Sequence, residues 1–245
     1  MGEENFMTEE ERIRRELERE EKEKRMNKVR KVAFIVFGGL FFLIILLSVL
    51  VRVFRPDPPL NWKANVRKPV IYLYPEETTE VSVLLDFNGE LTTTYPAYDN
   101  GWRVVAKPDG TLFDANGREY YCLYWEGESD IDFDMSEGFC VKGSETAAFL
   151  EEALAKLGLT RREANEFIVY WLPLMEGNEY NIISFRTDAY TENAKLIIDP
   201  QPDTLIRVFM AWYGSGKPVE IPEQSLAAPE RTGFTVVEWG GSEIR

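Results

Sequence analysis

The chain has 245 residues, with 28 Lys or Arg against 42 Asp or Glu and a net charge of −14 at pH 7. A surface this acidic repels nucleic acid, so the composition argues against a nucleic-acid-binding protein. The sequence contains no histidine, which excludes Ser-His-Asp and Cys-His catalytic pairs as well as histidine-ligated zinc.

The first 31 residues form a highly charged segment that carries ten Glu and ten Lys or Arg. Thr8 and Glu11 match a capping box, and Glu11 with Arg15 is one of several favourable i,i+4 pairs. We therefore predict one charged helix over residues 1–31, on the cytoplasmic side of a membrane.

An uncharged apolar run follows over residues 32–51. It would make about 30 Å of helix, which matches the hydrocarbon core of a bilayer. Lys and Arg are more frequent before the run than after it, which places the amino end in the cytoplasm. Without a short apolar core and a cleavage site, the run is typical of an uncleaved signal anchor. We predict a single pass through the lipid bilayer over 32–53, with the rest of the chain outside the cytoplasm.

The segment after the apolar run changes from helical to extended character. Its prolines predict a linker over 54–67. From Lys68 onward the apolar residues alternate, which predicts strands. Asn88-Gly89, between the β-rich runs 80–87 and 91–95, predicts a two-residue hairpin.

Two helices are predicted in the middle of this region. One covers residues 145–156, and a capping box of Thr160 with Glu163 begins the second. The segment 167–172 (FIVYWL) is ambiguous between the end of that helix and a strand. Its aromatic and β-branched residues and the following Pro173 favour a strand.

The carboxyl-terminal part of the chain, 223–245, is predicted as a tail with a docking strand. Its β-forming residues 235–239 follow a stretch with several prolines. Such a strand returns to an edge of its own sheet or adds to a sheet of another molecule, and we favour the first. The predicted class is α+β, namely the charged helix and one transmembrane helix followed by a mainly antiparallel β-rich domain with two helices over 68–222.

Cys122 and Cys140 are the two cysteines of the chain. Outside the cytoplasm a disulfide between them could persist, and closing this loop would stabilise the fold by about 3 kcal/mol. A buried free thiol at Cys122 is an equally good interpretation, because this residue lies in an apolar run.

Four acidic residues alternate along one predicted strand and its continuation. They project from one face about 7 Å apart, where a Ca²⁺ ion with oxygen ligands would relieve their repulsion. The alternative is a solvated acidic edge that discourages strand pairing. The candidate metal ligands are Glu128, Asp130, Asp132 and Asp134.

Carboxylates and aromatic rings are the remaining candidates for chemistry. Glu126 with Asp130 could form the acid pair of a glycosidase. Tyr121, Tyr124 and Trp125 could line a groove for a glycan or a peptide, although aromatic residues within strands usually belong to the core.

Several motifs resemble a family of uncharacterised bacterial and, more distantly, fungal proteins. The resemblance covers nearly all of residues 68 to 241 and implies one module without an assigned activity. Its motifs are KPVIYLYP from Lys68, YCLYWEG from Tyr121, YWLP from Tyr170, Pro202-Asp203-Thr204 with Arg207-Val208, and FTVVEWGG from Phe234.

The sequence therefore favours a membrane-anchored binding or scaffolding module outside the cytoplasm, without catalytic turnover. Its partner would be an envelope glycan or another protein. The alternative is a carboxylate-dependent hydrolase of cell-envelope glycans, in which Glu126 and Asp130 would be catalytic.

Overall fold

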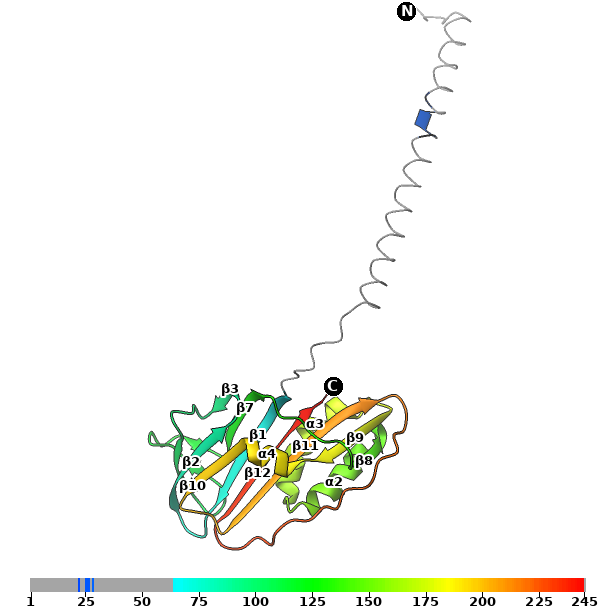
Figure 1. The fold of residues 1–245 in the computed structure, drawn as a ribbon. Helices are drawn as coiled ribbons and strands as arrows, with labels where there is room; N and C mark the ends of the chain where they lie inside the picture. The colour runs from blue at the N-terminus through cyan, green and yellow to red at the C-terminus, as the bar shows by residue number, and fades with distance from the viewer. Residues whose placement is uncertain (1–21, 23–24, 27, 29–63, 245) are drawn as a thin grey trace, which may run out of the picture. The chain divides into compact units, whose positions relative to one another are not determined.

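The computed structural model describes residues 22, 25–26, 28 and 64–244 (Figure 1). The chain divides into two compact units, residues 1–60 and 61–245. In the first unit the four described residues are helical, and the rest of the helix predicted over 1–31 lies outside the described residues.

The predicted fold class is corrected by the structure. The predicted span 32–53 lies outside the described residues. No helix in the part of the chain that the structure describes is long and apolar enough to cross a bilayer. For the described residues the class is that of a β-rich domain with few helices, and the transmembrane helix and signal anchor form no part of it. The predicted location outside the cytoplasm stays a prediction.

The larger sheet, sheet A, has seven strands in the order β3-β7-β1-β12-β11-β9-β8 (Figure 1). Its pairings are antiparallel except that of β11 with β12, which is parallel. The first strand already begins within the range predicted as a linker, 54–67. The strands are β1 (Ala64–Tyr74), β3 (Glu90–Tyr95), β7 (Leu123–Ser129), β8 (Phe139–Lys142), β9 (Tyr180–Phe185), β11 (Thr204–Ser215) and β12 (Thr235–Glu243).

The smaller sheet, sheet B, has five strands in the order β10-β2-β4-β5-β6, and all of its pairings are antiparallel. It is formed mainly by the first half of the domain, with β10 added from the second half. Its strands are β2 (Thr79–Phe87), β4 (Trp102–Ala106), β5 (Leu112–Phe113), β6 (Glu119–Tyr120) and β10 (Ala194–Asp199).

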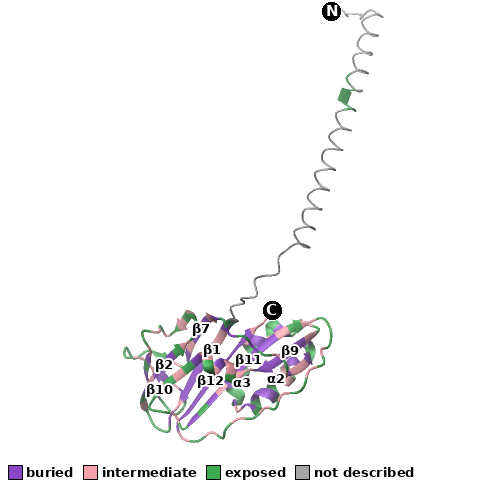
Figure 2. Cartoon of the chain, viewed as in Figure 1, coloured by how far each residue is buried: buried purple, intermediate pink, exposed green. Residues whose placement is uncertain are grey.

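Sheet A separates two hydrophobic cores. On one face its residues Val237 and Trp239 pack with helical residues such as Phe167. On the other face Val236 and Phe209 pack with sheet B and α4. The central strands β1, β12 and β11 are largely buried (Figure 2). The helices are η1 (Gly143–Glu145), α2 (Thr146–Lys156), α3 (Arg161–Met175) and α4 (Thr187–Asn193).

The segment 167–172, predicted as a strand, is part of helix α3. The capping box of Thr160 with Glu163 is confirmed and begins this helix. Phe167, Trp171 and Met175 are fully buried, whereas Val169 is 67% exposed. This helical spacing buries one face against sheet A, and packing of that face outweighs the intrinsic β preference of the residues. Pro173 is tolerated near the end of the helix.

The hairpin predicted at Asn88-Gly89 is wrong, because β2 and β3 belong to different sheets. The chain crosses from sheet B to sheet A at this point. A Cβ atom on Gly89 would clash with the carbonyl oxygen of Glu128, so glycine is required for a close approach to β7. The Asn-Gly pair therefore reflects a crossing between sheets instead of a tight turn.

The terminal strand does dock within its own domain, but not at an edge as predicted. β12 lies in the centre of sheet A, between β1 and β11. Its residues are buried from Thr235 to Ser242. Because β12 runs parallel to β11, the chain needs a long connection to return to the starting end of the sheet. The proline-containing residues 216–234 provide it.

Candidate functional site

The site is built around a β-bulge in the central strand β1. Lys68 and Pro69 together lie opposite the single residue Gly240 of β12, since Arg67 pairs with Gly241 and Val70 with Trp239. A Cβ atom on Gly240 would lie 3.1 Å from the Pro69 ring, so the glycine makes room for the bulge. Proline cannot donate to a ladder, and a bulge is the usual way for a sheet to accommodate one.

The bulge holds Lys68 in a conformation that lysine rarely adopts. Its φ angle is +59°, in the left-handed region. The residue before a proline normally adopts an extended conformation, so this backbone is doubly unfavourable. The Lys68 N–H, displaced from the ladder, donates to Glu126 Oε1 at 3.1 Å. Non-glycine residues in the left-handed region cluster at functional sites, where the surrounding structure maintains the strain.

The Lys68 side chain joins three elements. Its Nζ lies 5.1 Å from the ring centroid of Tyr124 on β7 and 5.8 Å from that of Tyr170 on α3. Both distances fit cation–π contacts. Both rings are half-buried. Burial and a hydrogen bond to Glu126 raise the pKa of Tyr124, and burial followed by the charge of Glu126 raises the pKa of Tyr170.

A third tyrosine adds exposed aromatic surface. Tyr121 immediately precedes the buried Cys122 and is 53% exposed. The neighbouring Cys122 thiol, then burial and the charge of Glu166 on α3, raise the pKa of Tyr121. We call these five residues the tyrosine seam: Lys68, Tyr121, Tyr124, Glu126 and Tyr170.

Polar contacts along α3 fix the helix on sheet A and on the connection before β12. The Tyr72 hydroxyl donates to Glu166 Oε2 at 2.8 Å. One turn earlier, the almost fully buried Glu163 forms an ion pair with Arg231. Since α3 is held at two points, the Tyr170 ring has a defined position over β1.

Trp125, predicted as a ligand-binding residue, points away from the tyrosine seam into the core. Its Nε1 donates to Glu238 Oε1 at 3.1 Å, and Arg207 Nε donates to Glu238 Oε2 at 2.6 Å. The Arg207 guanidinium lies 4.7 Å from the Tyr190 ring centroid. Glu238 is completely buried, so this network keeps a charge paired inside the protein. Adjacent strand residues face opposite sides, which separates Trp125 from Tyr124 and Glu126.

Of the predicted acidic face, Asp130, Asp132 and Asp134 are exposed while Ile131 and Phe133 between them are buried. Glu128, the fourth predicted ligand, is half-buried on β7. No group of three or more Asp, Glu, Cys or His among the described residues could hold a metal ion. Asp134 instead accepts hydrogen bonds from the N–H and hydroxyl of one residue, Ser136, at 2.9 and 2.8 Å, which lower its pKa.

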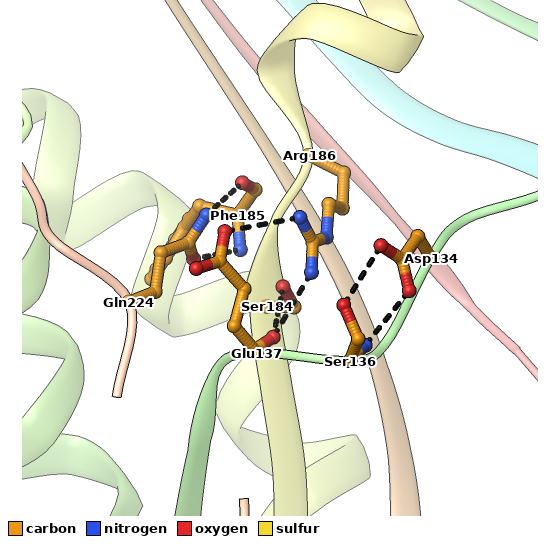
Figure 3. A network of polar contacts seen from close by, with 7 residues as sticks. All are labelled: Asp134, Ser136, Glu137, Ser184, Phe185, Arg186 and Gln224. Atoms are coloured by element: carbon orange, nitrogen blue, oxygen red, sulfur yellow. Dashed lines mark hydrogen bonds and ion pairs between the residues drawn. The ribbon is translucent and has the colours of Figure 1, made fainter. Parts of the chain in front are cut away.

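Asp132 and Asp134 border a cavity of about 440 Å³ at the end of β9. Figure 3 shows Arg186 reaching towards Glu137, and its Nη2 donates to the Glu137 carbonyl oxygen at 3.1 Å. Arg186 Nη1 lies 3.3 Å from Glu137 Oε1. The contacts of Glu137 with Arg186 therefore hold the loop after β7 against the end of β9.

The two cysteines are free thiols in the structure, Cys122 buried and Cys140 half-buried. Burial raises the pKa of Cys122 to about 12. Cys140 Sγ accepts a hydrogen bond from the Val219 N–H at 3.3 Å. Of the two interpretations left open by the sequence, the structure has the buried thiol.

Of the residues selected from the sequence, the structure brings Tyr124 and Glu126 together, and Tyr121 lies three residues before Tyr124 at an exposed position. Lys68 was not selected, although it is central to the site. A proline one position later in an otherwise β-forming run is the available signal, since it marks a bulge or an edge strand. Nothing in the spacing of the sequence places Tyr170 of α3 beside them.

No family model matches the chain, and no solved structure matches it. The chain is similar to a protein of Butyrivibrio fibrisolvens described as an uncharacterized protein in the bglA 3′ region. The two are 48% identical over 64 residues, which is 25% of this chain and 66% of that protein. The chain thus spans just under two thirds of that relative, whose description names no activity. The resemblance to an uncharacterised family stays a prediction.

Proposed function

We propose that residues 61–245 form a non-catalytic binding module that takes up a neutral glycan on the tyrosine seam. The observation that supports this proposal most strongly is Lys68. A bulge in a central strand maintains an unfavourable backbone conformation, and the ammonium group thereby stands between Tyr124 and Tyr170. A structural role alone does not require a proline and a bulge in a central strand, because a strand without them would satisfy the ladder without strain.

The chemistry of the seam suits a ligand with many hydroxyl groups. Aromatic rings offer flat apolar faces to the C–H groups of a sugar, and tyrosine adds a polar tip. Lys68 supplies hydrogen-bond donors and Glu126 supplies acceptors, and their charges cancel. A sugar hydroxyl is both donor and acceptor, so a glycan can use both groups, whereas a singly charged ligand would meet one favourable and one unfavourable group.

The alternative hydrolase would need a second carboxylate at a suitable separation from Glu126. The groups recorded around Glu126 are the Lys68 N–H, Tyr124 and Tyr170. Asp130 lies in the exposed loop after β7 ends at Ser129. The contacts of Glu126 therefore give more support to binding than to acid catalysis.

The test is retention of the full chain on insoluble cellulose, chitin and peptidoglycan, with released sugars measured in parallel. We expect retention on at least one polymer without released product. Tyr121→Ala, at an exposed position, should weaken retention about tenfold, which corresponds to about 1.4 kcal/mol. Tyr213→Ala, at a half-buried position near the end of β11, is the control and should bind as the parent does.

Equal retention of the parent and Tyr121→Ala would contradict a glycan site at the seam, as would failure to bind all three polymers. Released oligosaccharides that disappear in Glu126→Gln would instead identify the hydrolase. Because Tyr121 is largely exposed, its substitution should leave the melting temperature unchanged, so lost retention would not reflect unfolding.

A further inference from the structure

The two sheets have four edge strands, and three of them are protected against pairing with another chain. β8 is covered by the chain after β11, since the Gly138 N–H donates to the Pro222 carbonyl at 2.8 Å. β6 has only two residues. β3 carries a register shift between Leu91 and Thr93. Covered, short and irregular edges are the usual ways in which proteins prevent sheet-to-sheet association.

The fourth edge, β10, has none of these protections. It has six residues, contains no proline and pairs with β2 in regular register. The Asn88 N–H donates to the Asn193 carbonyl at the start of this pairing. Because hydrogen-bonded pairs alternate along an antiparallel ladder, Leu196 and Ile198 turn their N–H and C=O groups to the open edge. The contacts recorded among the described residues include no partner for these groups.

The side chains of β10 in one copy are complementary to those of β10 in a second copy. Lys195, Ile197 and Asp199 are exposed on the outer face of sheet B. If two copies of β10 pair antiparallel with Ile197 opposite Ile197, Lys195 of each copy faces Asp199 of the other. Opposite charges directly across a strand pair are stabilising, and this register forms two such pairs.

The same register also fits the backbone. It places Leu196 opposite Ile198 of the second copy, and these are the residues whose backbone groups are open. Each of the two Leu196–Ile198 pairs can exchange two hydrogen bonds, which gives about four in total. A shift by one residue would bring backbone groups that already serve β2 to the interface, so the charge register and the hydrogen-bond register coincide.

An exposed apolar pair lies in the centre of this arrangement. Leu84 of β2 is the cross-strand neighbour of Ile197, and these residues are 42% and 55% exposed. We propose that β10 is an interface at which two copies of this chain join their five-stranded sheets into one continuous sheet. Leu84 and Ile197 of both copies then form one apolar row, with a Lys–Asp pair on each side.

The proposed interface is separate from the tyrosine seam. Sheet B covers one face of sheet A, and α3 with the seam lies on the other. Pairing through β10 therefore leaves both seams open, and a failure of glycan binding would not affect this proposal.

Single charge reversals test the register. Sedimentation equilibrium of the full chain should show a concentration-dependent dimer. Lys195→Glu should raise the dissociation constant at least tenfold, because two carboxylates then face each other across each end of the strand pair, and Asp199→Lys should do the same with two ammonium groups. Mixed in equal amounts, the two variants should form a heterodimer, since both cross-strand pairs are again of opposite charge. Arg118→Glu, beside β6 at the opposite edge of sheet B, is the control and should associate as the parent does.

A cysteine at the twofold position gives a second, independent measurement. Ile197→Cys should form a disulfide-linked dimer under mild oxidation, because directly opposed residues of a non-hydrogen-bonded pair come close enough. Leu84→Cys, one strand further from the interface, should not, and neither should the parent with its two native cysteines. A monomeric parent at all concentrations, or a dimer unaffected by Lys195→Glu and not linked by Ile197→Cys, would overturn the proposal.

Discussion

The unfavourable backbone conformation of Lys68 is partly offset by the contacts of its side chain. Lys68 and Asn100 are the non-glycine residues with positive φ in the described part of the chain, and Lys68 alone precedes a proline. A left-handed conformation costs roughly 1–2 kcal/mol for a residue with a Cβ atom. The cation–π contacts with Tyr124 and Tyr170 contribute about 0.5–1 kcal/mol of stabilisation each.

Glycine at position 68 should therefore give a more stable protein than alanine does. Lys68→Gly and Lys68→Ala both remove the ammonium group, but only glycine relieves the left-handed strain. We expect Lys68→Gly to be more stable than Lys68→Ala by about 1 kcal/mol in urea unfolding. At the neighbouring Arg67, which has no positive φ, alanine should be the more stable of the two. The same order at both positions would contradict a strained bulge.

Burial of the Cys122 thiol makes the free energy of unfolding depend on pH. Its thiol pKa is raised from 9.0 to about 12, mainly by burial. Above pH 9 the unfolded chain loses this proton while the folded chain keeps it. The stabilisation of the folded state by this thiol is therefore present below pH 9 and is lost as pH rises towards 12. The free energy of unfolding should therefore fall as pH rises through this window, and the slope should be smaller in Cys122→Ala.

Gln224 takes the place of a neighbouring strand beside Phe185, which lies beyond the first residue of β8. Its side-chain amide accepts from the Phe185 N–H at 2.9 Å and donates to the Phe185 carbonyl at 2.7 Å, as a neighbouring strand would (Figure 3). Gln224 thereby fastens the connection from β11 to β12 across the edge of the sheet.

Removing this amide should destabilise the domain. Gln224→Ala leaves two backbone groups of Phe185 without their partner, which should cost about 1–3 kcal/mol in thermal or urea unfolding. Gln224→Glu keeps an acceptor for the N–H but loses the donor, so an intermediate loss is expected. Glu220→Ala, on the same connection and without a recorded hydrogen bond to a strand, is the control. Equal stability of the parent and Gln224→Ala would show that water replaces the amide without loss.

The elements that the sequence predicted correctly are those with a local cause. Thr160 with Glu163 fixes the start of α3 because both partners lie within one turn. The strand predicted for residues 167–172 is wrong because β propensity is a weak preference, and the burial of Phe167 and Trp171 on one face of a helix outweighs it. The destination of the chain after Asn88-Gly89 depends on contact with β7, far later in the sequence, and no local pattern encodes it. The site follows the same rule: Glu126 and Tyr124 lie on one face of one strand, whereas Tyr170 reaches them only through packing.

In the whole domain, β12 joins two groups of strands. On one side lie β3, β7 and β1, and on the other β11, β9 and β8. β12 also carries Glu238, the partner of Arg207 and Trp125 in the core. Cohesion of sheet A therefore depends on one strand that is far in sequence from β1.

Truncation after Gln224 should abolish cooperative unfolding of the domain. It removes β12 and leaves Arg207 charged and unpaired in the core, which alone is worth about 3–5 kcal/mol. We expect no sharp thermal transition for the truncated chain by circular dichroism. Addition of a synthetic peptide of residues 233–245 should restore a transition if the gap in sheet A persists. A truncated chain that melts like the parent would show that β12 is dispensable.

The central position of β12 has a consequence for synthesis on the ribosome. β1 is the first strand of the domain to emerge and β12 follows all the others, yet the two are neighbours in the middle of sheet A. Until β12 has left the exit tunnel, the strands on either side expose their inner edges. These are open edges of the kind that pair with other chains. The nascent domain thus stays vulnerable to aggregation until β12 has emerged, and chaperones would have to cover the strands on either side of its place until then.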